Sequence, residues 1–242
     1  MKKTLMAAAT TALMGLSAPA LAETWKPQDG DALYFGIYTE GGERFGTYAA
    51  RFEREDGNLI VHRSQNMSVT RMYMTVFNMD QRAKAVFSRK GLESLENRLD
   101  IQSPVGGQNR SLDVTREGRS LKARNNNGET HELPSNAWPI MFWHRSIIKR
   151  ENLFDMATGE TRPFIVTRRG FETVEANGEE IECEAYAINT LNEEGKDAAF
   201  VVWYEENSKF CRMEFDTPMG KAIFKRESEG SFDDGGEEES PV

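Results

Sequence analysis

The stretch LPSNAWPIMFWHRSIIKRENLFDMATGE (133–160) decides the fold, because it is the only dense run of apolar residues after the N-terminal leader. Asn136 can cap a helix and Pro139 is tolerated in a first turn, so the pattern predicts a short helix that begins here. The apolar residues cover most of the circumference of such a helix, which is typical of a buried helix. The rest of the chain alternates like β-strand. We therefore expect one helix buried against a curved sheet.

Strand-like runs and turn signals alternate on both sides of this segment, at the spacing of a barrel or sandwich. Gly41-Gly42, Asp56-Gly57 and Asn177-Gly178 are typical of tight hairpin turns. The predicted fold class is mainly β: a single strongly curved antiparallel sheet, a half-open barrel of about ten to twelve strands, wrapped around one short helix.

The ends of the chain have their own patterns. The leader MKKTLMAAATTALMGLSAPALA (1–22) has the charged start, short apolar run and small-residue cleavage site of a secretory signal, with cleavage after Ala22. A single β domain is expected over 23–226. The tail 227–242 has seven acidic and no basic residues, which is typical of disorder. No apolar stretch has the length of a transmembrane segment. We expect a periplasmic protein.

The chain shows no catalytic or metal-binding signature. Its histidines are far apart: His62, His131 and His144. Metal sites usually need ligands at short, fixed spacings. Four methionines suggest copper as an alternative: Met67, Met72, Met74 and Met79. Methionines on strands are more often core filler, and no nucleophile motif is present. We predict no enzymatic activity, no cofactor and no metal. The net charge of −9 does not favour nucleic acid as a partner.

Alternation also assigns faces to the later strands. One side of the strand 179–189 carries Ile181, Cys183, Ala185 and Ala187, and the other side carries the glutamates Glu180, Glu182 and Glu184. On the strand 209–217, Cys211, Met213 and Phe215 share one side. We interpret the apolar sides as lining a common concave interior.

Cys183 and Cys211 leave two possibilities open. Export to an oxidising compartment and a shared inward face favour a disulfide. In a simple meander, however, the strand 198–206 lies between them, and strands two apart are about 9–10 Å from each other. A disulfide tolerates a Cα separation of at most about 7 Å. Either the strand order is not a plain meander, or the thiols are free and buried.

Four segments carry a resemblance to a known family, in chain order ERFGTYAARF (43–52), LPSNAWPIMFW (133–143), GFETVEANGEEIECEAYAI (170–188) and VVWYEENSKFCRMEF (201–215). Together they resemble a family of bacterial periplasmic proteins of unknown function that is distantly similar to the LolA/LolB-like fold. That fold is a half-open antiparallel barrel over a helix, used by lipoprotein carriers and by envelope-integrity proteins. The resemblance implies a single LolA-like β domain over 23–226, and the acidic tail falls outside the shared pattern.

The resemblance and the apolar faces together predict a non-enzymatic protein that binds an acyl chain or other apolar ligand, from a lipid or lipoprotein, in its concave face. The predicted ligand-binding residues are Trp138, Phe142, Trp143, Ile147, Phe200, Val202, Met213 and Phe215. The same side chains are also what a packed core would contain. The alternative function is an envelope-integrity or scaffold protein that contacts an envelope protein partner through strand edges and the tail, with no small ligand.

Overall fold

The computed structural model describes residues 24–71, 74–191, 197–217, 220–230 and 232. The predicted signal peptide and the tail from residue 233 lie outside these residues. Within them, thirteen strands form one antiparallel sheet in the order β12-β13-β14-β15-β16-β1-β2-β3-β4-β5-β6-β7-β8. The protein is therefore mainly β and built on one large antiparallel sheet, as predicted.

The first eight strands of this sheet are β1 (Ala32–Thr39), β2 (Arg44–Glu55), β3 (Asn58–Arg71), β4 (Met74–Ser88), β5 (Gly91–Ser103), β6 (Gly106–Glu117), β7 (Ser120–Asn125) and β8 (Thr130–Pro134). The last five are β12 (Phe164–Ala176), β13 (Glu179–Leu191), β14 (Asp197–Tyr204), β15 (Phe210–Thr217) and β16 (Gly220–Glu227). Three short strands form a second sheet: β9 (Trp138–Pro139), β10 (Leu153–Phe154) and β11 (Thr161–Arg162).

Two of the predicted hairpin turns are confirmed by the backbone. Asp56 and Gly57 join β2 to β3 with φ values of 50° and 80°. Asn177 and Gly178 join β12 to β13 with φ values of 56° and 78°. A two-residue turn with both φ values positive matches the right-handed twist of the flanking strands, and Asp-Gly and Asn-Gly adopt it at the lowest steric cost. Local chemistry thus sets the register of both hairpins.

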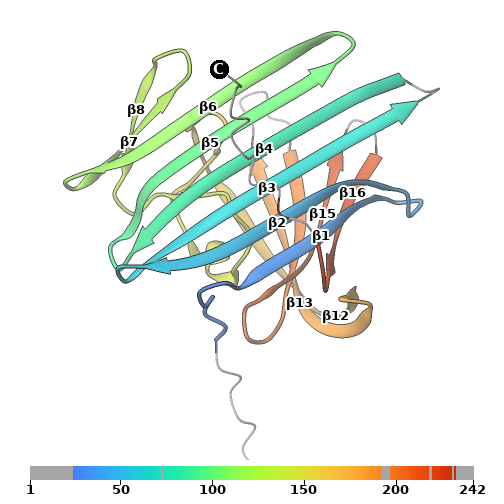
Figure 1. Ribbon diagram of the computed structural model, residues 1–242. Helices are drawn as coiled ribbons and strands as arrows, with labels where there is room; N and C mark the ends of the chain where they lie inside the picture. The colour runs from blue at the N-terminus through green and yellow to red at the C-terminus, as the bar shows by residue number, and fades with distance from the viewer. Residues whose placement is uncertain (1–23, 72–73, 192–196, 218–219, 231, 233–242) are drawn as a thin grey trace, which may run out of the picture.

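The large sheet is strongly curved. The long strands β1 to β6 cross the front of the molecule, and β13, β15 and β16 lie behind them at a steep angle (Figure 1). Pairing of β1 with β16, with Tyr34 opposite Glu227, joins the two halves into one sheet. The edge strands β12 and β8 are not neighbours in the strand order. The sheet therefore forms a curved wall with a concave inner face and does not close into a barrel.

The inserted segment (residues 135–163) packs against this concave face, but it does not form the predicted helix. Its only helix among the described residues is the five-residue 3-10 helix η1 (Arg145–Lys149). Trp138 and Pro139 are instead extended and pair in parallel with Leu153 and Phe154. A proline disfavours helical backbone at the residue before it, here Trp138. The amide of Trp138 donates to the Asn152 carbonyl at 2.8 Å, which satisfies it without a helix.

Burial of the segment, in contrast to its secondary structure, is as expected. Trp138, Phe142, Trp143 and Ile147 are all buried and belong to the main core cluster. In the sequence, these residues have the pattern of a helix that is apolar on all sides. In the structure the segment has the large sheet on one side and its own short strands on the other, so these residues are buried in both directions. No helix in the described part of the chain has the length and apolarity needed to cross a membrane.

Ile181, Cys183 and Ala185 share one side of β13 as predicted, but the prediction that this side faces the concave interior is wrong. Glu184, Tyr186 and Ile188 lie on the same side of the strand, and Tyr186 and Ile188 belong to the main core. Cys183 and Ala185 belong to a second, smaller cluster on the opposite side. The β12–β13 hairpin curls toward β16, where the Asn177 amide donates to the Arg226 carbonyl at 2.7 Å. Because the hairpin covers part of the outer face, β13 carries buried apolar residues on both sides, and alternation alone misassigned them.

Cys211 also faces the second cluster and does not share the side of Met213, because β15 contains a bulge. Trp203 pairs with Arg212, whereas Tyr204 pairs with Phe210, so Cys211 is the extra residue on the bulged strand. A bulge reverses the alternation of faces from that point onward. Met213 and Phe210 consequently both contact the main core.

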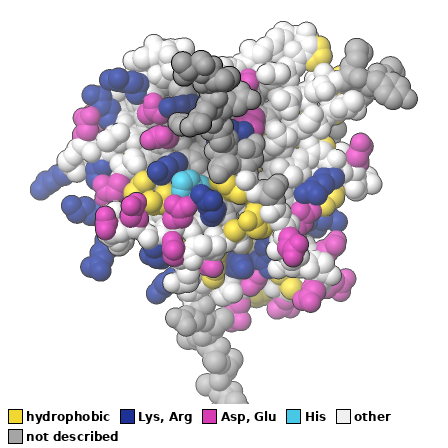
Figure 2. All heavy atoms as spheres, in the orientation of Figure 1, with side chains coloured by type: hydrophobic (Ala, Val, Ile, Leu, Met, Phe, Trp, Pro, Cys, Tyr) yellow, Lys and Arg dark blue, Asp and Glu magenta, His cyan; other side chains and the backbone are white. Residues whose placement is uncertain are grey.

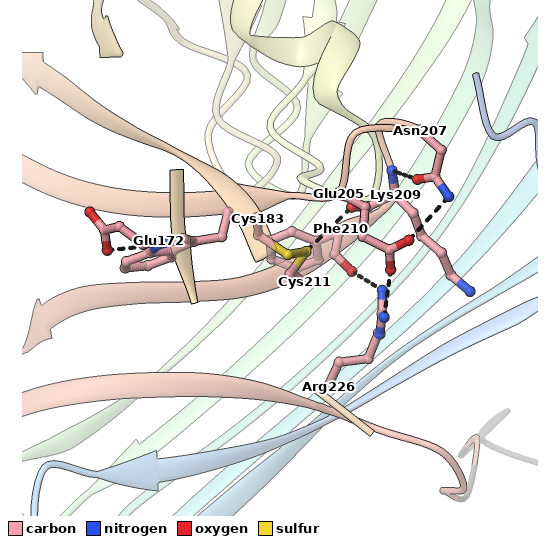
Figure 3. The surroundings of a disulfide bond; sticks show 9 residues. Glu172, Cys183, Glu205, Asn207, Lys209, Phe210, Cys211 and Arg226 are labelled. Atoms are coloured by element: carbon pink, nitrogen blue, oxygen red, sulfur yellow. Dashed lines mark hydrogen bonds and ion pairs between the residues drawn. A yellow bond between two sulfur atoms is a disulfide. The ribbon is translucent and has the colours of Figure 1, made fainter. Parts of the chain in front are cut away.

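Cys183 and Cys211 form a disulfide with a Cα separation of 6.9 Å (Figure 3). The disulfide considered from the sequence is thus confirmed. The order β13-β14-β15 is nevertheless a plain meander, so the inference that a bridge needs a different strand order is wrong. β14 ends at Tyr204, opposite Glu184, so Cys183 lies just beyond the strand that would separate it from β15. Arg226 holds the start of β15 nearby, since it donates to the Phe210 carbonyl at 2.9 Å.

Replacing both cysteines by alanine should lower the free energy of unfolding by about 3 kcal/mol, because the bridge closes a loop with a sequence separation of 28. The measurement is urea unfolding followed by tryptophan fluorescence. Wild type unfolded in the presence of a thiol reductant should approach the variant. Equal stability of the variant and the oxidised wild type would contradict a bridge that constrains the chain.

Candidate functional site

A cavity of about 310 Å³ lies between the inserted segment and the concave face of the sheet. Its wall contains five methionines: Met67, Met79, Met141, Met156 and Met213. Five aromatic rings also contribute: Tyr48, Phe142, Phe200, Phe210 and Phe215. The remaining lining residues are Arg63, Gln65, Gln81, Leu99, Ile140, Asp155 and Ala157. The inward positions of strands from both halves of the sheet therefore meet at one mainly apolar space.

Half of the predicted ligand-binding residues line this cavity. Phe142 of the inserted segment lies 5.8 Å from Phe200, centroid to centroid, and Phe200 lies 5.7 Å from Phe215. Met213 completes this group. These four side chains form one wall of the cavity, and the structure brings them together from β14, β15 and the inserted segment.

The other four predicted residues are buried in the main core and do not line the cavity: Trp138, Trp143, Ile147 and Val202. Trp138 stacks on Phe87 of β4 at 4.3 Å. Trp143 packs edge-on against Phe52 of β2 at 5.3 Å. Aromatic pairs of this geometry stabilise beyond their buried area. The two tryptophans therefore anchor the inserted segment to the sheet, and the cavity begins beside them.

The polar side of the cavity was missed in the sequence. Arg63 and Gln65 lie on β3, and Gln81 lies on β4, all at inward positions. Gln65 and Gln81 are only 6% and 9% exposed. The Gln81 amide donates to the Asn97 side chain at 3.0 Å. Alternation in the run 59–77 would have found the two residues of β3, because Arg63 and Gln65 share the side of Val61 and Met67.

Arg63 is the charged group of this polar side. Its guanidinium lies over the Tyr48 ring, 5.3 Å from the centroid, and donates to the Gln65 side-chain oxygen. Burial lowers the pKa of Arg63, although contact with Tyr48 and the charge of Asp155 oppose this effect. Burial also raises the pKa of the Tyr48 hydroxyl. Since an arginine stays protonated even with a lowered pKa, the cavity holds a positive charge beside a neutral phenol.

Two of the methionines suggested as copper ligands lie together in the structure. Met67 and Met79 lie opposite each other on β3 and β4 and line the cavity. Met72 lies outside the described residues. Among the described residues, no group of three or more histidine, cysteine, aspartate or glutamate side chains could hold a metal ion. Methionine side chains in an apolar wall adapt to irregular shapes, and this is the property they contribute here.

A buried ion cluster around Glu184 of β13 fixes η1 to the edge of the sheet. The carboxylate is 6% exposed and accepts hydrogen bonds from Arg145 at 2.8 Å, from Arg168 and from the Tyr186 hydroxyl. Burial by itself would raise the pKa of Glu184, but the hydrogen bonds from Tyr186 and Arg168 and the charge of Arg145 outweigh it and hold the pKa below its ordinary value. The cluster is saturated with partners, so its role is structural.

Surface charges do not single out a binding region on the face shown in Figure 2. Lys, Arg, Asp and Glu side chains are interspersed over the face in view (Figure 2). A second cavity of about 450 Å³ is lined mainly by polar residues between β6, the β7–β8 turn and the inserted segment, including Asn109, Asn126 and Glu129. Unlike the apolar cavity, it is lined by strands from only one half of the sheet.

These features define a mainly β protein whose curved antiparallel sheet encloses an inserted segment and an apolar cavity. The chain belongs to the DUF6134 family, a domain of unknown function, whose model matches residues 35–227. A comparison with curated proteins finds no match.

Two solved structures match most of this chain, with very different degrees of structural similarity. A beta-barrel-like protein of domain of unknown function DUF1849 from Brucella abortus matches with 10% identity and a TM-score of 0.59, over 81% of this chain and 94% of that chain. A candidate lipoprotein from Parabacteroides distasonis matches with 9% identity and a TM-score of 0.32, over 82% of this chain and 94% of that chain. The first likeness supports the fold alone, and the second carries no structural argument.

Replacing Glu184 by glutamine should destabilise the protein at pH 7 by about 1–3 kcal/mol, because two arginines lose their charged acceptor. A carboxylate with a lowered folded-state pKa stabilises the fold fully above its ordinary value of 4.5 and progressively less as pH falls through the lowered value. The difference between wild type and variant in urea unfolding should therefore shrink below that pH. The exposed Glu182→Gln serves as control, and a pH-independent difference would contradict the cluster.

Proposed function

We propose that this protein is a non-enzymatic periplasmic binding protein that holds one acyl chain or similar apolar chain in the cavity beneath the inserted segment. The observation that carries the proposal is the cavity wall itself, with its five methionines and five aromatic rings. Ligand pockets have mainly apolar walls with a few polar groups. This cavity has that composition.

The size of the cavity supports a single chain. Its volume of about 310 Å³ is at the lower end of the roughly 300–1,000 Å³ usual for small-molecule pockets. The flexible methionine side chains would allow chains of different length and kink to fit the same wall. A diacyl or triacyl lipid would place its further chains outside this space.

The disulfide supports a location outside the cytoplasm, because such bonds persist in oxidising compartments. The periplasm is the particular compartment that we propose, on the strength of the leader pattern. The similarity to the LolA/LolB-like fold remains a prediction from the sequence, and it agrees with a carrier role.

A second candidate function is favoured by the edge strand β12. Ile165 and Phe171 of this strand are 61% and 54% exposed, which is unusual for large apolar side chains. An exposed edge strand can pair with an extended segment of a partner protein. An envelope-integrity or scaffold role through this edge would need no small ligand. Native mass spectrometry of protein purified from its own periplasm without detergent distinguishes the two: retained lipid supports the carrier, and a lipid-free complex with a protein supports the scaffold.

Filling the cavity should weaken ligand binding. Met79→Trp places an indole in the space of part of the chain, and the loss of two buried methylenes would reduce affinity at least about tenfold. The measurement is displacement of a neutral apolar fluorophore by dodecanol. Asn66→Trp, at an exposed position of β3, is the matched control and should leave the affinity unchanged. Equal affinity of Met79→Trp and wild type would place the ligand elsewhere.

A further inference from the structure

Arg63 differs from three other arginines whose side chains are largely buried. Arg145 contacts the carboxylate of Glu184 at 2.8 Å, Arg212 contacts Glu214 at 2.6 Å, and Arg226 contacts Glu205 at 2.6 Å. In the part of the chain that the structure describes, Arg63 has no carboxylate oxygen within 4.0 Å, and its partners are the neutral side chains of Gln65 and Tyr48. A guanidinium has five N–H donors. Several of those on Arg63 thus remain available to a ligand.

Asp155 is the acid of the same cavity, and it does not neutralise Arg63 by contact. Its Oδ1 accepts hydrogen bonds from the backbone amides of Ala157 at 2.7 Å and Thr158 at 3.1 Å. The carboxylate therefore caps the turn of the inserted segment. Its charge reaches Arg63 without an ion-pair contact.

The surroundings of Arg63 suit the head of an amphiphile. Gln65 lies beside it on β3, and Gln81 faces the cavity from β4. Both side chains are more than nine-tenths buried. The methionine and phenylalanine wall, with Met213 and Phe215, bounds the same cavity. One space therefore offers a positive charge with amide groups and an apolar wall.

We propose that the ligand is a single-chain amphiphile with an anionic head, whose carboxylate binds Arg63 while its chain packs along the methionine and phenylalanine wall. This inference rests on the proposed function and narrows its substrate class to fatty-acid-like molecules. A charge-assisted, bidentate bond to arginine is stronger than a neutral hydrogen bond and fixes the orientation of the ligand. A neutral chain of equal length would bind in the same place with lower affinity.

The test compares three probes with one chain length: laurate, dodecanol and dodecyltrimethylammonium. The two ionic probes are used below their micelle concentrations, and dodecanol below its solubility limit. At about pH 8 laurate is ionised. Displacement of a neutral apolar fluorophore should give laurate an affinity at least about tenfold above that of dodecanol, with the ammonium probe weakest. Equal binding of laurate and dodecanol would overturn the head-group inference and leave the proposed function standing. Binding of none of the three would overturn both.

Substitutions test whether Arg63 is the residue that causes the preference for laurate over dodecanol. Arg63→Gln should remove the advantage of laurate, so that laurate and dodecanol bind this variant with similar affinity. Arg98→Gln, which removes the same charge from an exposed position of β5, should keep the advantage. Arg63→Lys, which retains the charge, should keep part of the preference. If circular dichroism shows that Arg63→Gln does not fold, the wild-type comparison and Arg63→Lys decide. A preference for laurate that survives in folded Arg63→Gln would overturn the assignment to Arg63.

Discussion

The packing of the inserted segment into the concave face is the interaction on which the rest of the structure depends. Trp138 stacks on Phe87, and Trp143 packs on Phe52, so the segment is anchored to the long strands of the first half of the sheet. A curved sheet of this size has an apolar inner face that must be covered. The inserted segment covers most of this inner face. The space that remains between the segment and the sheet is the cavity lined by Phe142 and its neighbours.

The outer face of the same sheet also carries apolar residues that are covered. The β12–β13 hairpin curls beyond the end of β14 and covers a small cluster around Trp203. The disulfide between Cys183 and Cys211 joins this hairpin to β15. Glu184, one residue away and on the inner side, ties the hairpin to η1 through Arg145. The outer side of β13 is therefore bonded to β15 and its inner side to η1, so this one strand fixes the position of the hairpin relative to the inserted segment.

Features set by local chemistry could be predicted from the sequence, and features set by tertiary context could not. Asp56-Gly57 and Asn177-Gly178 specify their turns by themselves, and the apolar density of the inserted segment indicates burial. A short buried apolar run does not distinguish helix from extended chain, however, and Pro139 acts here by excluding helix at Trp138. The bulge at Cys211 reverses a face with no marker in the pattern. The candidate site was predicted only in part for the same reason. Phe142 could be placed in the interior by the apolar density of its segment, and Phe200 by the alternation of its strand. The division between cavity wall and packed core depends instead on how far the inserted segment reaches. Arg63 belongs to no catalytic or metal-binding motif, and its only signal is a charge at an inward strand position, which is informative in any β-sheet with a concave face.

The most direct test of a cavity between the inserted segment and the sheet is a crystal structure with ω-bromolaurate, in which anomalous scattering locates the bromine. We predict one bromine position beside the wall formed by Met213 and Phe215, with the carboxylate at Arg63. Bromine found only on the protein surface, or side chains of the inserted segment that fill the space completely, would contradict a binding cavity at this place.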